Sequence, residues 1–148
     1  MNALERLVIR DECMQLMTAY CTHLDARNEK QFLDIFTEDA IWTKLTEPTS
    51  ETTGRAAIAD LFRKRPPSIL SRHLMLNHTI TIHGADSADG VAVGVVIRGN
   101  RDRETWPMPL RGVELVLEYR LSFRREPDRW RINRCDTMRL LDVEAVSQ

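Results

Sequence analysis

The chain has 148 residues, of which 43% are hydrophobic and 29% are charged, and this length fits a single domain covering residues 1–148. Lys and Arg number 21 against 22 Asp and Glu, and the net charge of −1 argues against a nucleic-acid-binding protein, which would carry a basic excess. The apolar runs are too short to span a bilayer, and the N-terminus carries acid and base before any apolar run, so we expect neither a membrane span nor a signal peptide.

The N-terminal segment predicts a long helix from Ala3 to about Ala26. Its apolar residues recur at helical spacing and cover a wide face, as in a helix that is clasped by a sheet. An acidic residue, Asp25, stands where this helix ends. The apolar positions of the helix are Leu4, Leu7, Val8, Cys13, Met14, Leu16, Met17, Tyr20, Cys21 and Leu24.

A second, shorter helix is predicted from Glu29 to about Phe36. Asn28 precedes it and Gln31 lies at its third position, which is the spacing of a capping box. Asp39–Thr43 then predicts a turn into a short strand. Thr46–Gly54 is polar and contains proline and glycine, so it predicts a loop.

The period of the sequence changes after a third predicted helix, Arg55–Lys64, which ends before two prolines. The segment Leu70–Ile82 predicts an extended strand whose side chains alternate between two faces. One face would carry Leu74, Leu76, Ile80 and Ile82. The other face would carry His73, Met75, Asn77 and Thr79.

The remainder of the chain predicts further strands. Val91–Ile97 is a β-rich apolar run, and Gly99–Gly112 contains two prolines and predicts a loop or flap. Val113–Arg125 alternates apolar and polar residues, and Trp130 to about Leu140 predicts the last strand. Helices followed by long antiparallel strands indicate an α+β fold rather than a βαβ repeat.

Several short segments, in this order and spacing, resemble the SnoaL-like branch of the NTF2-like superfamily, of the scytalone dehydratase and hexachlorocyclohexane dehydrochlorinase type. The resemblance implies a cone, in which a curved antiparallel sheet wraps around about three N-terminal helices and encloses one deep pocket. The matching segments are Tyr20–Asp25, Phe36–Trp42, Gly54–Ile58, Arg72-His73 with Asn77, and Trp130–Ile132 with Arg134.

The resemblance implies that Asp25 and His73 form a catalytic pair in this pocket. Histidine is the side chain best suited to accept a proton near neutral pH, and a carboxylate on its second nitrogen would fix the tautomer and stabilise the imidazolium. We expect Tyr20 and Asn77 to contact substrate as polar groups. The expected apolar walls of the pocket are Met17, Phe36, Trp42 and Met75.

Other chemistries have weaker support in the sequence. His73, His78 and His83 recur every five residues, but strand alternation would place His78 on the opposite face, so we predict no metal site. No phosphate-binding glycine loop is present in the sequence, and we expect no cofactor. The three cysteines form an odd set without metal-ligand spacing, which fits a reducing, cytoplasmic setting.

The expected function is that of a cofactor-free lyase or isomerase acting on a small, apolar, cyclic molecule. It would remove a proton and then lose water or halide, or shift a double bond. The alternatives are a non-catalytic binding or assembly module, such as the small subunit of ring-hydroxylating dioxygenases, and a polyketide cyclase or epoxide hydrolase. Outward apolar residues on a curved sheet also predict a homodimer or homotrimer.

Overall fold

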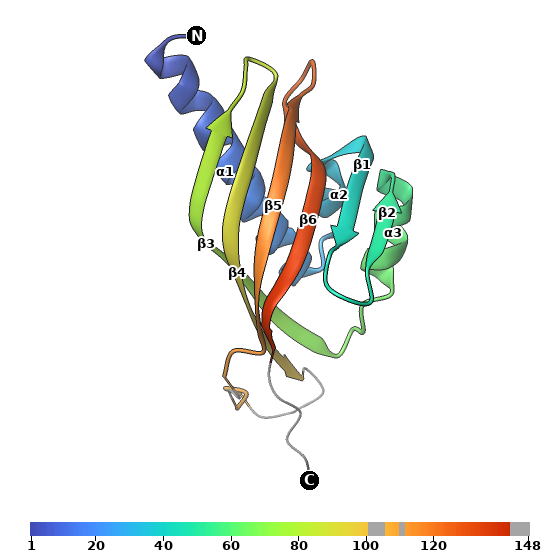
Figure 1. Ribbon diagram of the computed structural model, residues 1–148. Helices are drawn as coiled ribbons and strands as arrows, with labels where there is room; N and C mark the ends of the chain where they lie inside the picture. Colours follow the sequence, from blue (N-terminus) through green and yellow to red (C-terminus); the bar gives the residue numbers. More distant parts are fainter. Residues whose placement is uncertain (101–105, 110–111, 143–148) are drawn as a thin grey trace.

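The structure is a computed structural model that describes residues 1–100, 106–109 and 112–142. Within these residues the chain forms three helices and six strands, in the order that the sequence predicts for an α+β fold (Figure 1). The helices are α1 (Ala3–Ala26), α2 (Glu29–Asp34) and α3 (Arg55–Arg63). The strands are β1 (Phe36–Lys44), β2 (Ser50–Thr53), β3 (Ile69–Ile82), β4 (Ser87–Asn100), β5 (Leu115–Arg125) and β6 (Trp130–Asp142).

The described strands form one curved, open sheet in the order β2-β1-β6-β5-β4-β3. Neighbouring strands are antiparallel except for β1 and β6, which run parallel. Helix α1 crosses one face of the sheet and packs against β3 and β6, whereas α3 packs against β1 and β2 (Figure 1). The predicted α+β architecture is therefore confirmed, with one parallel pair in a sheet that we expected to be wholly antiparallel.

Helix α1 begins and ends where the sequence predicts. Its first turn is held by a capping box, in which the Asn2 side chain accepts from the Glu5 backbone N–H at 2.9 Å and the Glu5 carboxylate accepts from the Asn2 N–H at 2.7 Å. The helix ends at Arg27, which is left-handed with φ 59°. Its buried residues recur at helical spacing and are Ile9, Cys13, Met17, Tyr20, Cys21, Leu24 and Asp25.

The segment after α1 differs from the prediction. Asn28 does precede α2, but its side chain makes no capping hydrogen bond, and its backbone N–H donates instead to the His23 carbonyl at the end of α1. Helix α2 stops at Asp34 because the Ile35 carbonyl accepts from the Ile132 N–H at 2.8 Å, which starts the parallel pairing of β1 with β6. The predicted polar loop contains a short strand, β2, paired with the end of β1.

Strand β3 contains a bulge that the sequence pattern does not indicate. Asn77 has φ 54°, and the pairing with β4 shifts register between Leu76 and Thr79. Side chains on either side of the bulge therefore change face. Leu74 and Leu76 are 42% and 45% exposed, whereas Ile80 and Ile82 pack against the core. The prediction that these four residues share a face is wrong for this reason.

The core lies between α1 and the sheet. In β5 the predicted alternation is confirmed, because Leu115, Leu117, Tyr119, Leu121 and Phe123 are all buried. The three cysteines are buried and free. No helix among the described residues is long and apolar enough to cross a membrane. Half of the predicted loop or flap over residues 99–112 lies outside the described residues, and its first two residues, Gly99 and Asn100, belong to β4.

Candidate active site

Asp25 and His73 meet at the junction of α1 and β3. Asp25 follows Met17 and Cys21 at four-residue spacing, so it shares the buried face of the helix. The Asp25 Oδ1 atom lies 2.5 Å from His73 Nδ1, and Asp25 Oδ2 accepts from the His73 backbone N–H at 2.7 Å. Both side chains are about nine-tenths buried, with exposed fractions of 10% and 9%. The two residues are thus a buried, hydrogen-bonded pair.

Two further polar residues support this pair. The Ser71 hydroxyl donates to Asp25 Oδ1 at 2.9 Å, and the Arg65 guanidinium donates to the Ser71 oxygen, also at 2.9 Å. Arg65 also donates to the Leu24 carbonyl at the end of α1 at 2.9 Å. The chain Arg65–Ser71–Asp25–His73 therefore connects the segment after α3, the end of α1 and the start of β3.

The carboxyl of Asp25 stays ionised despite its position. Burial raises its pKa, and the C-terminal end of a helix also disfavours negative charge. The hydrogen bonds from His73 and Ser71, together with attraction to the His73 ring, outweigh burial and hold the pKa below its ordinary value. Asp25 is therefore a carboxylate that accepts a hydrogen bond from His73 Nδ1–H, and this tautomer leaves Nε2 as the ring nitrogen that can accept a proton.

His73 lines a cavity of ≈ 360 Å³ at one end of the sheet, here called the main cavity because it has the larger set of lining residues of the two that His73 borders. Each of the six strands contributes to its lining, together with the end of α1 and the segment around α3. In Figure 1 this is the lower end of the sheet, away from the N-terminus. The lining residues are Tyr20, Leu24, Trp42, Lys44, Ser50, Thr52, Leu61, Arg65, His73, Val96, Arg98, Leu115, Leu117, Tyr119, Thr137 and Arg139.

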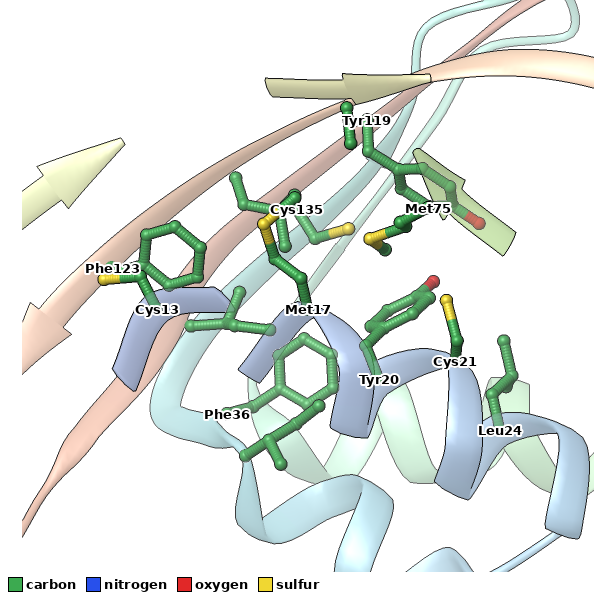
Figure 2. Close-up of a cluster of buried hydrophobic side chains, with 14 of the residues drawn as sticks. Cys13, Met17, Tyr20, Cys21, Leu24, Phe36, Met75, Tyr119, Phe123 and Cys135 are labelled. Atoms are coloured by element: carbon green, nitrogen blue, oxygen red, sulfur yellow. The ribbon is translucent and has the colours of Figure 1, made fainter. Parts of the chain in front are cut away.

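Three of the residues predicted for the site, His73, Tyr20 and Trp42, line this cavity. Tyr20 is 2% exposed, and burial raises the pKa of its hydroxyl well above the ordinary value. Its ring packs on that of Tyr119 with centroids 5.6 Å apart (Figure 2). The phenol is therefore neutral at physiological pH and is available only as a hydroxyl.

The other predicted contact residues lie elsewhere. Met17, Phe36 and Met75 belong to the core cluster between α1 and the sheet and are absent from the cavity lining (Figure 2). Asn77 is exposed in the bulge of β3 and is also absent from the lining. Asp25 does not line this cavity either, but it borders a second cavity of ≈ 420 Å³ together with Cys21, Thr22, Ala26, Arg72 and His73.

Sequence reasoning missed the cationic side chains of the cavity. Lys44, Arg65, Arg98 and Arg139 all line it, and the lining contains no Asp or Glu. Part of this arrangement follows from strand geometry. Lys44 lies two residues after Trp42 on β1, and Arg98 on β4 pairs directly with Ser71 on β3. The pairing of β3 with β4 is what brings Arg98 beside the Asp25–His73 pair.

No cluster of three or more metal-ligating side chains exists among the described residues. His73 and His78 lie on β3, and His83 directly follows it. The prediction of their faces assumed regular alternation along the strand, which the bulge between Leu76 and Thr79 interrupts. His83 pairs instead with Asp89 on β4, at 2.7 Å.

Comparison with known proteins identifies the same architecture. A family model described as "SnoaL-like domain" matches residues 5–136. An NTF2-like protein with a cystatin-like fold from Novosphingobium aromaticivorans is 25% identical, with a TM-score of 0.76 over 93% of this chain and 85% of that one. Comparison with curated proteins gives no match.

Two further solved structures share the fold at lower identity. A candidate scytalone dehydratase from Novosphingobium aromaticivorans is 18% identical, with a TM-score of 0.81 over 99% of this chain and 94% of that one. The type 3 hexachlorocyclohexane dehydrochlorinase from Novosphingobium barchaimii is 17% identical, with a TM-score of 0.79 over 99% and 97% of the two chains.

Proposed function

Because this chain belongs to the SnoaL-like family of the NTF2-like superfamily, we propose that it is a lyase or isomerase in which His73 is the general base. Asp25 orients the imidazole and stabilises its protonated form. The observation that carries the proposal is the position of His73, which contacts the buried Asp25 carboxylate at 2.5 Å and also lines the main cavity. General-base catalysis by a positioned histidine contributes roughly 10²–10⁴-fold to a rate.

The proposed reaction begins when His73 Nε2 removes a proton from a carbon of the bound molecule. The electrons of the broken C–H bond form a carbon–carbon double bond. In an elimination, the neighbouring carbon–oxygen or carbon–halogen bond breaks and the leaving group departs with its electron pair. In an isomerisation, the imidazolium returns the proton to a different carbon. In both reactions Asp25 balances the positive charge that forms on His73.

Negative charge develops on the substrate during proton removal, and Arg65 is suited to stabilise it. Its guanidinium lines the same cavity as His73 and donates to Ser71, which lies two residues before His73 on the same face of β3. Burial lowers the pKa of Arg65, but the ordinary pKa of a guanidinium lies so far above neutral pH that the group remains charged. Arg65 is partly buried, and a partly buried cation exerts a stronger field on a developing anion than a cation in water does.

The alternative of a non-catalytic binding or assembly module would gain support if Asp25 and His73 lay more than about 6 Å apart and no cavity existed. The 2.5 Å contact and the ≈ 360 Å³ cavity both weigh against it. We therefore favour the enzymatic function. Two proteins of the same fold, described as a dehydratase and a dehydrochlorinase, are consistent with this choice, since both of their activities are eliminations.

The test is turnover of a panel of cyclic alcohols, halides and enones, together with proton NMR detection of C–H exchange into D₂O. We expect His73→Ala to lower either signal by about 10²-fold or more. The matched control is His83→Ala, since His83 is an exposed histidine that lies outside the cavity lining. Equal rates for His73→Ala and the parent protein would remove His73 from the mechanism.

A further inference from the structure

The main cavity is cationic rather than purely apolar. Four of its lining residues carry positive charge and none carries negative charge. Arg98 pairs with Glu114, and Arg139 pairs with Asp142 at 2.9 Å. Lys44 and Arg65 have no carboxylate within ion-pair distance among the described residues. Two cations in the lining are therefore available to a ligand.

Lys44 lies far from the proposed base. It ends β1, the second strand from one edge of the sheet, whereas His73 lies on β3 at the opposite edge. Three strands separate β1 from β3, and neighbouring strands are about 4.8 Å apart. Lys44 is therefore at the end of the cavity remote from His73.

The surroundings of Lys44 suit an anionic oxygen. Lys44 pairs with Thr137 on β6 and with Ser50 on β2, and both of these residues also line the cavity. Thr52 of the same β2 strand adds a third hydroxyl to the lining. An ammonium group has three N–H donors, and with hydroxyl-bearing residues as its strand neighbours in the lining it can bind the oxygens of a carboxylate.

The strands between these two ends carry the ion-paired Arg98 and Arg139, and the rest of the lining there is largely apolar. It is formed mainly by side chains from α1, α3, β4 and β5, namely Leu24, Leu61, Val96, Leu115 and Leu117. The cavity thus has a cationic end at Lys44, an apolar middle and a reactive end at His73 and Arg65.

We propose that the cavity binds a small organic carboxylate, with the carboxylate on Lys44, the apolar body over the leucines and the reacting carbon at His73. Only the position of the reacting carbon rests on the proposed function. The binding of the anion at Lys44 follows from the lining alone. Attachment at a remote group would hold the reacting carbon in place for proton removal.

Calorimetric titration with a matched pair of probes tests the proposal. Cyclohexanecarboxylate and cyclohexanecarboxamide have the same apolar body and differ in charge. We expect the parent protein to bind the carboxylate about tenfold more tightly than the amide or better, as for a hydrogen bond to a charged group. Lys44→Met should remove this preference and leave the affinity for the amide unchanged.

The matched control is Lys30→Met, which removes an exposed lysine of α2 outside the cavity and should keep the preference. Equal affinity for the two probes, absence of carboxylate binding, or an unchanged preference in Lys44→Met would each overturn the proposal. Binding is read without turnover. If His73→Ala loses activity and the parent protein shows no preference for the carboxylate, the proposed function stands and this inference is rejected. If His73→Ala keeps the parent activity and the parent protein prefers the carboxylate, the anion site at Lys44 stands and the proposed function is rejected.

Discussion

At the level of single residues, the pair of Asp25 and His73 could be predicted from the sequence, but its surroundings could not. Helical spacing places Asp25 on the buried face of α1, and the family resemblance selects His73. Ser71 donates to the Asp25 carboxylate and Arg65 donates to the Leu24 carbonyl, each at 2.9 Å. In both hydrogen bonds the donor and the acceptor lie more than 40 residues apart in the sequence. Such contacts depend on how α1, α3 and β3 pack, and no local pattern encodes them.

The depressed pKa of Asp25 makes a prediction about stability. The folded pKa lies below the ordinary value of 3.8, so Asp25 stabilises the folded state above that value and loses this contribution as pH falls through the folded pKa. Charged or titratable groups near it are His73 on β3, Cys21 on α1, Arg65 after α3 and Tyr119 on β5. The hydrogen bonds to its carboxylate are the cause of the depression.

We therefore expect Asp25→Asn to lower the free energy of unfolding by about 1.5–3 kcal/mol at pH 7, the range for hydrogen bonds to a charged group. The deficit should shrink as pH falls below 3.8. Urea unfolding from pH 7 to pH 2 measures both effects. Asp86→Asn, in the exposed turn before β4, should follow the parent protein across this range. A deficit that stays constant with pH would contradict the role of the charge.

At the level of elements, the sequence predicts most of the helices and strands but not their interruptions. The alternation of β5 is local and is observed. The apolar face predicted for α1 is buried at Cys13, Met17, Tyr20, Cys21 and Leu24, but its predicted positions Leu4, Leu7, Val8 and Met14 are exposed. The bulge at Asn77 is set by pairing with β4, and the early end of α2 is set by pairing with β6. These irregular positions depend on a partner strand, so the sequence pattern of one element does not contain them.

Gly94 on β4 gives a prediction about this sheet. It pairs with Met75 on β3 and with Leu117 on β5, and a Cβ placed on it would lie 2.5 Å from Tyr119 Cε2 and 2.8 Å from Leu117 Cγ. Tyr119 is 3% exposed, so its ring has little room to move. We expect Gly94→Ala to lower the free energy of unfolding by about 1–3 kcal/mol, as overpacking does.

Urea unfolding of Gly94→Ala measures this cost. Gly84→Ala is the matched control, because a Cβ at position 84 would meet only the Asp86 side chain, at an ordinary 3.4 Å. Because Tyr119 and Leu117 line the main cavity, Gly94→Ala should also weaken binding of the cyclohexane probes. Equal stability of the two alanine variants would show that the sheet yields at Gly94.

At the level of the whole molecule, exposed apolar side chains gather on at least two surfaces of the part of the chain that the structure describes. One is the N-terminal part of α1, which extends past β3 in Figure 1 and exposes Leu4 and Leu7 by 68% and 61%. The other, here the outer β3–β4 patch, lies on the sheet face away from α1 and consists of Leu74, Leu76, Val91, Val93 and Val95. The bulge in β3 separates Leu74 and Leu76, which are exposed, from Ile80 and Ile82, which pack against the core.

We expect the outer β3–β4 patch to mediate the dimer or trimer that the sequence predicts. Its leucines and valines pair across two neighbouring strands, with Leu74 opposite Val95 and Leu76 opposite Val93, so they form one continuous surface. A sheet that buries one face on helices can use the other face for a second copy. Burial of one leucine stabilises an assembly by about 1.5–3 kcal/mol, and a twofold interface would contain each leucine twice.

Leu76→Glu should therefore raise the dissociation constant of the assembly by about 100-fold or more, because it removes apolar burial and places two like charges at the interface. Sedimentation equilibrium across a range of protein concentrations measures this constant. Leu7→Glu makes the same chemical change on α1, where 61% of the residue is exposed, and should leave the assembly intact. If Leu7→Glu dissociates the protein and Leu76→Glu does not, the interface lies on α1. The outer β3–β4 patch would then be a free surface, and the apolar character of its valines would have no role in self-association.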